Sequence, residues 1–148
     1  MVKGKYRKAV FILGYAIKNK TPEYLLLKRK LHWKGWEFPK GKIEPRENKI
    51  ETAKRELREE TGHLALKVKK FNYSGKYKYH KLLPDRPGFI GQTFSLFAAE
   101  IKRNGKIKLD PKEHSGYKWV DYKQALKMIK FPNQKKSLRI VNGWLRKR

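Results

Sequence analysis

Three glutamates stand close together in one segment of the sequence, at a spacing that could support metal-dependent chemistry. Glu56, Glu59 and Glu60 fall in the window 48–61, whose pattern is typical of a helix. At 100° per residue, Glu56 and Glu60 lie together and Glu59 lies one step further round. Carboxylates this close repel one another, so either a pKa rises or cations neutralise them. Hard oxygen ligands favour magnesium or manganese, so this segment is a candidate metal site.

The same charges could instead belong to an ordinary solvated helix face. Glu51, Arg55 and Glu59 follow one another at intervals of four residues, which is the spacing of stabilising surface ion pairs. Arg55 lies beyond Glu59 on the helix, where it could also brace a cluster of glutamates. For this helix taken alone both interpretations stand, and the wider pattern has to decide between them.

A wider set of fixed residues favours the chemical interpretation. Gly41 is followed after five residues by Glu47, after seven more by Arg55-Glu56-Leu57, after one by Glu59-Glu60, and after one by Gly62. Without Leu57, the seven remaining identities at roughly 1 in 15 each would match a given register about once in 10^8 by chance. This pattern resembles the Nudix box. It departs from the box at His63, where the family usually has an aliphatic residue, and we interpret this as a packing change at the helix end.

The resemblance implies a Nudix hydrolase, an enzyme in which water cleaves a diphosphate linkage of a nucleoside diphosphate derivative. It implies an α/β fold, specifically a Nudix-type α/β/α sandwich with a mixed β-sheet, and Mg²⁺ or Mn²⁺ as cofactor. The residues that it assigns to catalysis and metal binding are Glu56, Glu59, Glu60, Arg55 and the backbone carbonyl of Lys40. The residues that it assigns to the structure of the box are Gly41, Glu47 and Gly62, with Arg55 helping to hold loop and helix in register.

Two segments outside the helix reduce the number of candidate substrates. Residues 36–42, Trp-Glu-Phe-Pro-Lys-Gly-Lys, resemble the start of the box in diadenosine tetraphosphate hydrolases, RNA 5′-pyrophosphohydrolases and messenger-RNA decapping enzymes. Residues 90–92 and 113–119 resemble segments of the first two groups. In that resemblance Glu113 stands where those enzymes keep a loop carboxylate that binds metal or acts as general base. The alternative interpretation is that Glu113 is an acidic loop residue without a chemical role.

Aromatic and basic residues alternate in the segment 72–81. A strand places Tyr73, Tyr77 and Tyr79 on one face, apart from Lys76 and Lys78. Tyrosines can stack on a base and lysines can hold phosphates, although a half-buried strand with its rings in the core has the same pattern. The candidate substrate-binding residues are Lys42, Tyr77, Tyr79, Lys81 and Gln92. The four histidines show no ligand spacing, and none is assigned to a metal.

The charge of the chain is strongly unbalanced. Its 39 Lys and Arg against 13 Asp and Glu give a net charge of +26, and seven of the acids fall within residues 37–60. Residues 61–84 and 122–148 contain no acid and carry six and nine basic residues. Such a field attracts polyanions, which makes RNA a candidate partner beside a nucleotide or dinucleoside polyphosphate substrate. A thermophile's charged surface is the alternative, but it usually adds Glu along with Lys.

Length and composition limit the class of protein. The 148 residues fit a single domain spanning 1–148, and 39% hydrophobic residues are enough for a core. The absence of cysteine excludes a disulfide framework, thiolate-bound zinc and a cysteine nucleophile, and it favours a reducing, cytoplasmic location. The first apolar run, residues 9–17, is too short for a signal peptide or a membrane span, so no membrane partner is expected.

The elements that must position these residues follow from the hydrophobic pattern. We expect strands at 8–18, 24–29, 64–69, 71–79, 90–101 and 117–120, and helices at 48–61, 122–130 and 133–146. Asn48 and Glu51 form a capping pair and Gly62 ends the first helix. Ile50, Ala53 and Leu57 form the stripe expected to face the core.

Three functions remain open on the sequence. The first is asymmetrical hydrolysis of diadenosine tetraphosphate to ATP and AMP. The second is action on RNA 5′ ends, as an RNA 5′-pyrophosphohydrolase or a decapping enzyme, which the basic charge favours. The third, of another class, is a non-catalytic nucleic-acid-binding module, against which the intact glutamates count.

Overall fold

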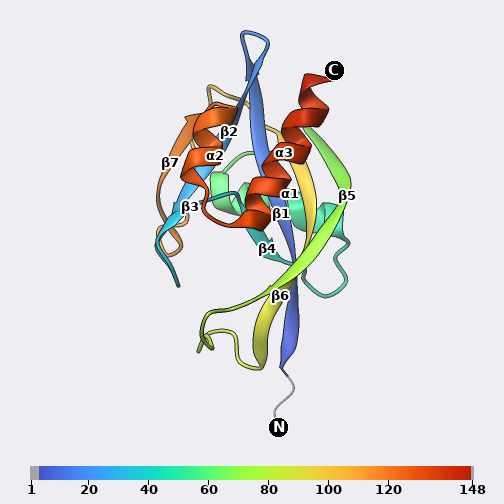
Figure 1. Cartoon of the computed structure of the whole chain (residues 1–148), viewed down its shortest axis with the longest axis vertical. Coiled ribbons are helices and arrows are strands. Elements are labelled where there is room, and N and C mark those ends of the chain that lie inside the picture. Colours follow the sequence, from blue (N-terminus) through green and yellow to red (C-terminus); the bar gives the residue numbers. More distant parts are fainter. Residues whose placement is uncertain (1–3, 148) are drawn as a thin grey trace.

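The computed structural model describes residues 4–147 (Figure 1). Its strands are β1 (Lys5–Lys18), β2 (Thr21–Arg29), β3 (Gly35–Glu37), β4 (Lys40–Lys42), β5 (Lys67–Lys78), β6 (Phe89–Glu100) and β7 (His114–Val120). Its helices are α1 (Lys49–Thr61), α2 (Tyr122–Met128) and α3 (Pro132–Arg146). None of the helices in residues 4–147 is long and apolar enough to cross a membrane.

One mixed sheet organises the chain around β1. The strand order is β3-β2-β1-β6-β5, with β4 paired to β1 and β7 paired to β2. Strands β1 and β6 run parallel, whereas the other pairs are antiparallel. On one edge, β1 pairs with β2 at Tyr15–Lys18 and with β4 at Ala9–Phe11. Strand β1 therefore holds the loop before α1 against the centre of the sheet.

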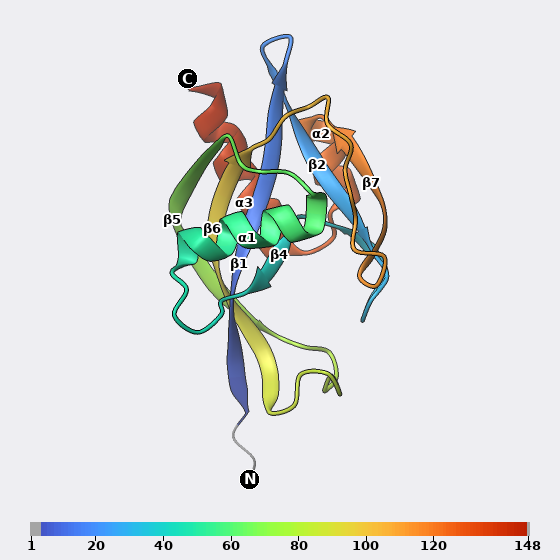
Figure 2. The same ribbon diagram turned by 180° about the vertical axis from the view of Figure 1, so that it is seen from behind.

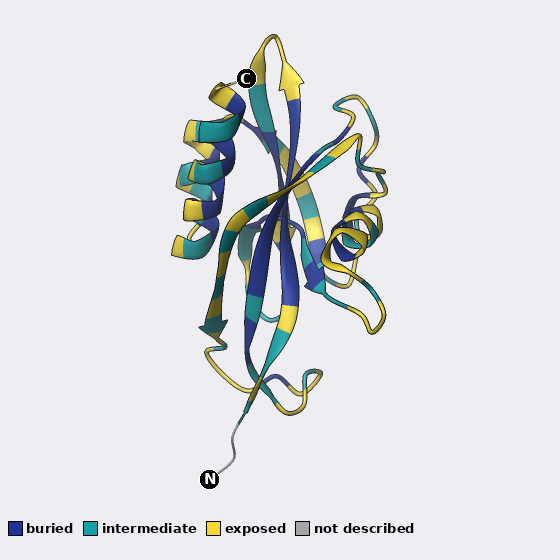
Figure 3. Ribbon diagram, turned by 90° about the vertical axis from the view of Figure 1, so that its right-hand side faces the viewer, coloured by how far each residue is buried: buried dark blue, intermediate teal, exposed yellow. Residues whose placement is uncertain are grey.

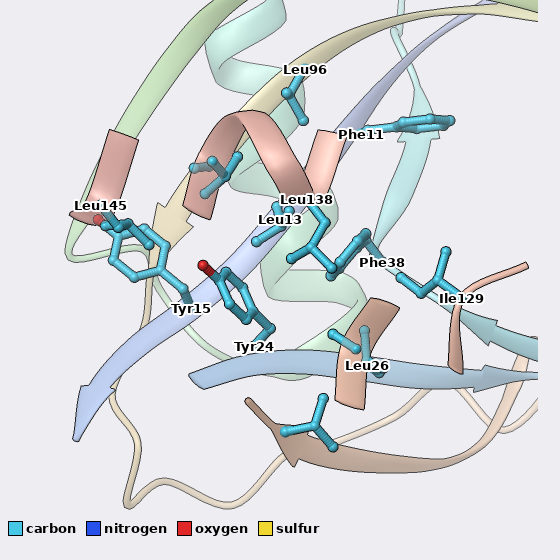
Figure 4. Close-up of a cluster of buried hydrophobic side chains, with 14 of the residues drawn as sticks. Phe11, Leu13, Tyr15, Tyr24, Leu26, Phe38, Leu96, Ile129, Leu138 and Leu145 are labelled. Carbon is cyan, nitrogen blue, oxygen red and sulfur yellow. The ribbon is translucent and has the colours of Figure 1, made fainter. Parts of the chain in front are cut away.

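The two faces of the sheet bury two separate apolar cores. Alternation in β1 sends Phe11, Leu13 and Tyr15 to the face covered by α3 and α2, where Leu138 packs against them (Figure 4). Val10 and Ile12 point to the other face and pack with Ala53 and Leu57 of α1. Figure 3 shows α3 and α1 on opposite sides of the sheet. The predicted α/β/α sandwich with a mixed sheet is confirmed.

The predicted ends of α1 agree with the structure. The Asn48 side chain accepts a hydrogen bond from the Glu51 N–H, and the Glu51 side chain accepts one from the Asn48 N–H. Gly62 adopts φ 78° and donates its N–H to the Arg58 carbonyl, a conformation that glycine enters without steric cost. These caps fix where the helix begins and ends, and therefore where Glu56, Glu59 and Glu60 lie along it.

Ile50 does not face the core as predicted. Its side chain is 46% exposed, whereas Ala53 and Leu57 are buried. Ile50 lies in the first turn of α1 next to Lys49, which lines an open hollow together with Lys8 and Thr93 of the sheet. The apolar contact therefore starts one turn later than the sequence pattern indicates.

Other elements also differ from the prediction. The two strands expected at 64–69 and 71–79 form one strand, β5, whose register with β6 shifts between Lys70 and Ser74. Leu64 and Leu66 are exposed and precede it. Strands β3 and β4 were not predicted, because three residues are too few to show a period. Pro132 is the first residue of α3, where its missing N–H costs no hydrogen bond.

Candidate active site

The first component of the site is the contact between α1 and β4. The Lys40 N–H donates a 3.0 Å hydrogen bond to Oε2 of Glu60, whose residue is only 2% exposed. A β-carbon at Gly41 would overlap the carboxyl group of Glu56, so only glycine allows this close approach of strand and helix. The structure thus brings the backbone of Lys40 beside Glu60 and Glu56.

Arg55 joins the loop before α1 to the glutamates of the helix. Its Nε donates to Oε2 of Glu47 at 2.7 Å, and its Nη2 donates to the Lys42 carbonyl at 2.8 Å. Its Nη1 donates to Glu56 at 2.8 Å and to Glu59 at 3.1 Å. The side chain of Glu59 is 55% exposed, against 14% for Glu56. Arg55 therefore lies where it can fix the Glu56 carboxylate, as the sequence suggested.

The carboxyl groups of Glu56 and Glu60 are not fully neutralised by nearby positive charges. Burial raises the pKa of Glu56 to about 7, against the hydrogen bond and charge of Arg55. Burial, together with the charges of Glu37 and Glu56, raises the pKa of Glu60 well above its usual range. Buried carboxylates that resist ionisation gain most from a bound divalent cation. The electrostatics of the site therefore fit a metal.

Glu113 reaches the same place from another part of the chain. Ligand atoms of Glu60, Glu113 and His114 all lie within 4.8 Å of one another. The predicted approach of Glu113 to the helix glutamates is therefore present in the structure. His114, to which no metal was assigned from the sequence, belongs to this group, and its position directly after Glu113 was the available signal.

Glu37 is the centre of a buried ionic network that was not identified from the sequence. Its side chain is fully buried, and its Oε2 accepts hydrogen bonds from Nη1 of Arg29 at 3.2 Å and Nε2 of His114 at 2.8 Å. Lys40 Nζ lies 3.3 Å from Oε1. Burial alone would raise the pKa of Glu37, but Lys40, the His114 hydrogen bond and Arg29 lower it to about 2. Arg29 also lies 3.8 Å from Glu113, so the network reaches the carboxylate cluster.

An aromatic and basic cavity of about 590 Å³ adjoins this network. Arg29 and Lys40, which both contact Glu37, line one part of it. Other lining residues include Phe11, Trp33, Tyr77, Tyr79, Lys81 and Arg86. Three of the five candidate substrate residues, Tyr77, Tyr79 and Lys81, thus line the cavity.

The other two candidate substrate residues lie outside the cavity lining. The Lys42 carbonyl accepts a hydrogen bond from Arg55. Gln92 is fully buried, and its Oε1 accepts hydrogen bonds from Arg7 at 3.2 Å and from the Tyr79 hydroxyl at 3.1 Å. Gln92 therefore orients its neighbours from beneath the surface.

Two arginines meet at Gln92, and neither was found from the sequence. Arg86 donates hydrogen bonds to the Tyr79 hydroxyl at 3.0 Å and to Oε1 of Gln92 at 3.5 Å. The same Oε1 atom also accepts a hydrogen bond from Arg7. Burial and the charge of Arg86 lower the pKa of Arg7, whereas the nearby charge of Glu56 opposes this. Within residues 4–147 neither arginine forms an ion pair with a carboxylate. Their positive charge is available to an anion next to the cavity.

Comparison with known proteins agrees with this arrangement. A family model described as the NUDIX domain matches residues 5–140. The chain is 33% identical over 128 residues to the asymmetrical bis(5′-nucleosyl)-tetraphosphatase of Mus musculus. The aligned region covers 81% of this chain and 78% of that protein. It is 31% identical over 137 residues to an RNA pyrophosphohydrolase of a Nitratiruptor species, with 88% of each covered. A solved binary complex of a C. elegans Ap4A hydrolase matches the fold with a TM-score of 0.77 at 22% identity, over 96% of this chain and 99% of that one.

Proposed function

The chain belongs to the Nudix hydrolase family, and from this premise we propose that it cleaves diadenosine tetraphosphate asymmetrically, to ATP and AMP. The observation that carries the proposal is the position of the aromatic cavity. It adjoins the Glu37 network through Arg29 and Lys40, and that network adjoins the glutamates of α1. A base in the cavity would thus leave its phosphate chain directed at the carboxylates.

The carboxylate cluster fits a magnesium or manganese ion. Its donors are hard oxygens, and two of them are buried with raised pKa values, as expected for ligands of a divalent cation. The residues that would hold the metal are Glu56, Glu59, Glu60, Glu113 and the backbone carbonyl of Lys40, with His114 beside them. A bound metal would polarise a phosphoryl oxygen and lower the pKa of the attacking water.

The side chains around the cavity would bind and orient the substrate. Tyr77 and Tyr79 line the cavity as an edge-to-face pair with ring centroids 6.3 Å apart. Aromatic rings at the cavity wall would stack on an adenine. Arg7 and Arg86, which lack carboxylate partners among the described residues, would neutralise the phosphate chain together with Lys81. Gln92 would keep Arg7 and Tyr79 in place.

The proton of the attacking water needs an acceptor. Glu113 is our first candidate, because its side chain is 30% exposed and lies with Glu60 in the same cluster. Accepting that proton would free the oxygen to attack phosphorus, while the leaving group departs as a nucleotide. Glu56 is the second candidate, since its pKa of about 7 would suit a base near neutral pH.

Action on RNA 5′ ends is the second candidate function, because the net charge of +26 exceeds what a dinucleotide requires. Purified protein with magnesium should be given diadenosine tetraphosphate and 5′-triphosphorylated RNA side by side, with products separated by chromatography. We expect kcat/KM at least tenfold higher for the dinucleotide. A tenfold preference for RNA would establish the second function, and binding without hydrolysis of either would establish a non-catalytic module.

The cavity can be tested with a matched pair of variants. Tyr77→Leu should raise KM for diadenosine tetraphosphate about tenfold, because it removes a stacking face worth about 1–3 kcal/mol. Tyr117→Leu removes an exposed tyrosine from β7 outside the cavity and should leave KM unchanged. Equal effects of both substitutions would contradict the assignment of the cavity to the base.

A further inference from the structure

A second hollow, of about 480 Å³, lies on the opposite face of the sheet from the aromatic cavity. Its lining includes Lys8 of β1, Thr93 of β6, Lys76 of β5 and Lys49 of α1. The register explains why they meet, since Lys8 pairs with Thr93 and Thr93 pairs with Lys76 in one row across three strands. We call this hollow the α1-face groove.

The α1-face groove is open because α1 covers only part of its side of the sheet. The apolar contact of α1 with Val10 and Ile12 begins at Ala53, and the preceding turn leaves Ile50 exposed. Figure 2 shows the lower parts of β1 and β6 extending beyond α1. The sheet face next to the first turn thus carries Lys8, Lys76 and Thr93, and the groove is also lined by the apolar residues Ala9, Ile43 and Phe94.

The lysines of the groove have no acidic partners in the described part of the chain. Among residues 4–147, none of Lys8, Lys49 and Lys76 forms an ion pair. Lys76 Nζ instead lies 5.0 Å from the centroid of the Tyr6 ring, which stands one row further along the same face. Three uncompensated ammonium groups around a concave surface attract a polyanion. The groove therefore has the charge and shape of a binding site for phosphates.

We propose that the α1-face groove binds a single strand of RNA. The lysines would hold successive backbone phosphates, and the Tyr6 ring offers a stacking surface at one end. Ser74 and Ser95 pair in the next row of the lining, so with Thr93 they place three hydroxyl groups beside the lysines. A hydroxyl group can both donate to and accept from a ribose 2′-OH, the group that distinguishes RNA from DNA. The proposal rests on no part of the proposed hydrolysis, because no residue that lines the groove belongs to the carboxylate cluster or to the aromatic cavity.

The test compares two triple variants with equal loss of charge. In the groove variant, Lys8, Lys49 and Lys76 are each changed to Gln. In the control variant, the exposed residues Lys18, Lys102 and Lys123, all outside the groove, are changed to Gln. Binding of a labelled single-stranded RNA is measured from about 50 to 300 mM salt, so that the slope of log K against log salt can be determined. Thermal melting checks that both variants are folded.

We expect the groove variant to bind RNA at least tenfold more weakly at low salt. Its slope of log K against log salt should be shallower by about 2, since three phosphate contacts at about 0.7 each are lost. Hydrolysis of diadenosine tetraphosphate should be unchanged in both variants. Equal weakening in the control variant would show a diffuse field with no specific site, and unchanged RNA binding in the groove variant would also overturn the proposal.

The choice of RNA over DNA has its own test. Thr93→Val keeps the shape of the side chain and removes its hydroxyl group. We expect the unaltered protein to prefer RNA over DNA of the same sequence, and Thr93→Val to reduce that preference with little change in salt slope. Equal binding of RNA and DNA by the unaltered protein would contradict the assignment to RNA.

Discussion

Nε2 of His114 donates a 2.8 Å hydrogen bond to Oε2 of Glu37, a residue 77 positions earlier in the chain. Both side chains are fully buried. The bond joins the start of β7 to the end of β3, and the residue before His114 is Glu113. The pair therefore sets how far Glu113 extends towards the glutamates of α1, although neither residue has to contact the substrate.

Replacing Glu37 should reveal this positioning role. Glu37→Gln keeps the shape but leaves Lys40 without a carboxylate partner among the described residues and Arg29 with only the more distant Glu113, which we expect to lower the free energy of unfolding by about 3 kcal/mol. Because the pKa of Glu37 is lowered from its ordinary value of 4.5 to about 2, its carboxylate stabilises the folded protein fully at pH values above 4.5. This stabilisation is lost as the pH falls towards 2. Urea titrations should thus show that the free energy of unfolding differs between the unaltered protein and Glu37→Gln near neutral pH, and that this difference becomes smaller at about pH 3. A constant difference would contradict the assignment.

Hydrolysis should depend on the carboxylate of Glu60. Glu60→Gln preserves an acceptor for the Lys40 N–H but removes a charged metal ligand, so turnover should fall by about 10²-fold or more with the fold intact. Addition of EDTA should abolish activity of the unaltered protein. Glu44→Gln, at an exposed position in the loop between β4 and α1, is the matched control and should remain active. Activity that persists in EDTA would refute a metal-dependent reaction.

The metal-free protein should become less stable as the pH rises. Because the pKa of Glu56 is raised to about 7, the folded state holds a proton that the unfolded chain releases near pH 4.5. Stability is then lost between about pH 4.5 and 7. In EDTA at about pH 8, we expect Glu56→Gln to increase the free energy of unfolding by about 1–2 kcal/mol, and to change it little below about pH 4.5. Urea titration measures this, and a destabilised variant at the higher pH would count against the raised pKa.

Glu113→Gln distinguishes the possible roles of the loop carboxylate. As a general base, Glu113 would act in the transition state, so its loss should lower kcat by about 10²- to 10⁴-fold with little change in KM. If Glu113 serves only as a metal ligand, added magnesium should restore part of the rate. An unchanged kcat would leave Glu56 as the base.

The local features of the site could be predicted from the order of the residues alone. The spacing from Gly41 to Gly62 identified the box, and the capping residues Asn48 and Glu51 located the start of α1. Alternation in the segment 72–81 predicted that Tyr77 and Tyr79 share one face, and both line the cavity. These features were predictable because helix and strand periods, caps and fixed loops depend on residues near one another in the chain.

Which distant residues meet became visible only in the folded chain. Arg7 and Arg86 come together on Gln92, and Glu37 meets His114, through contacts across the sheet that no local period records. The same holds for Ile50, which has the correct spacing for burial but is 46% exposed in the folded chain. Burial and pairing of charge depend on the packing of segments far apart in sequence, because the energy of a side chain is set by what surrounds it in space.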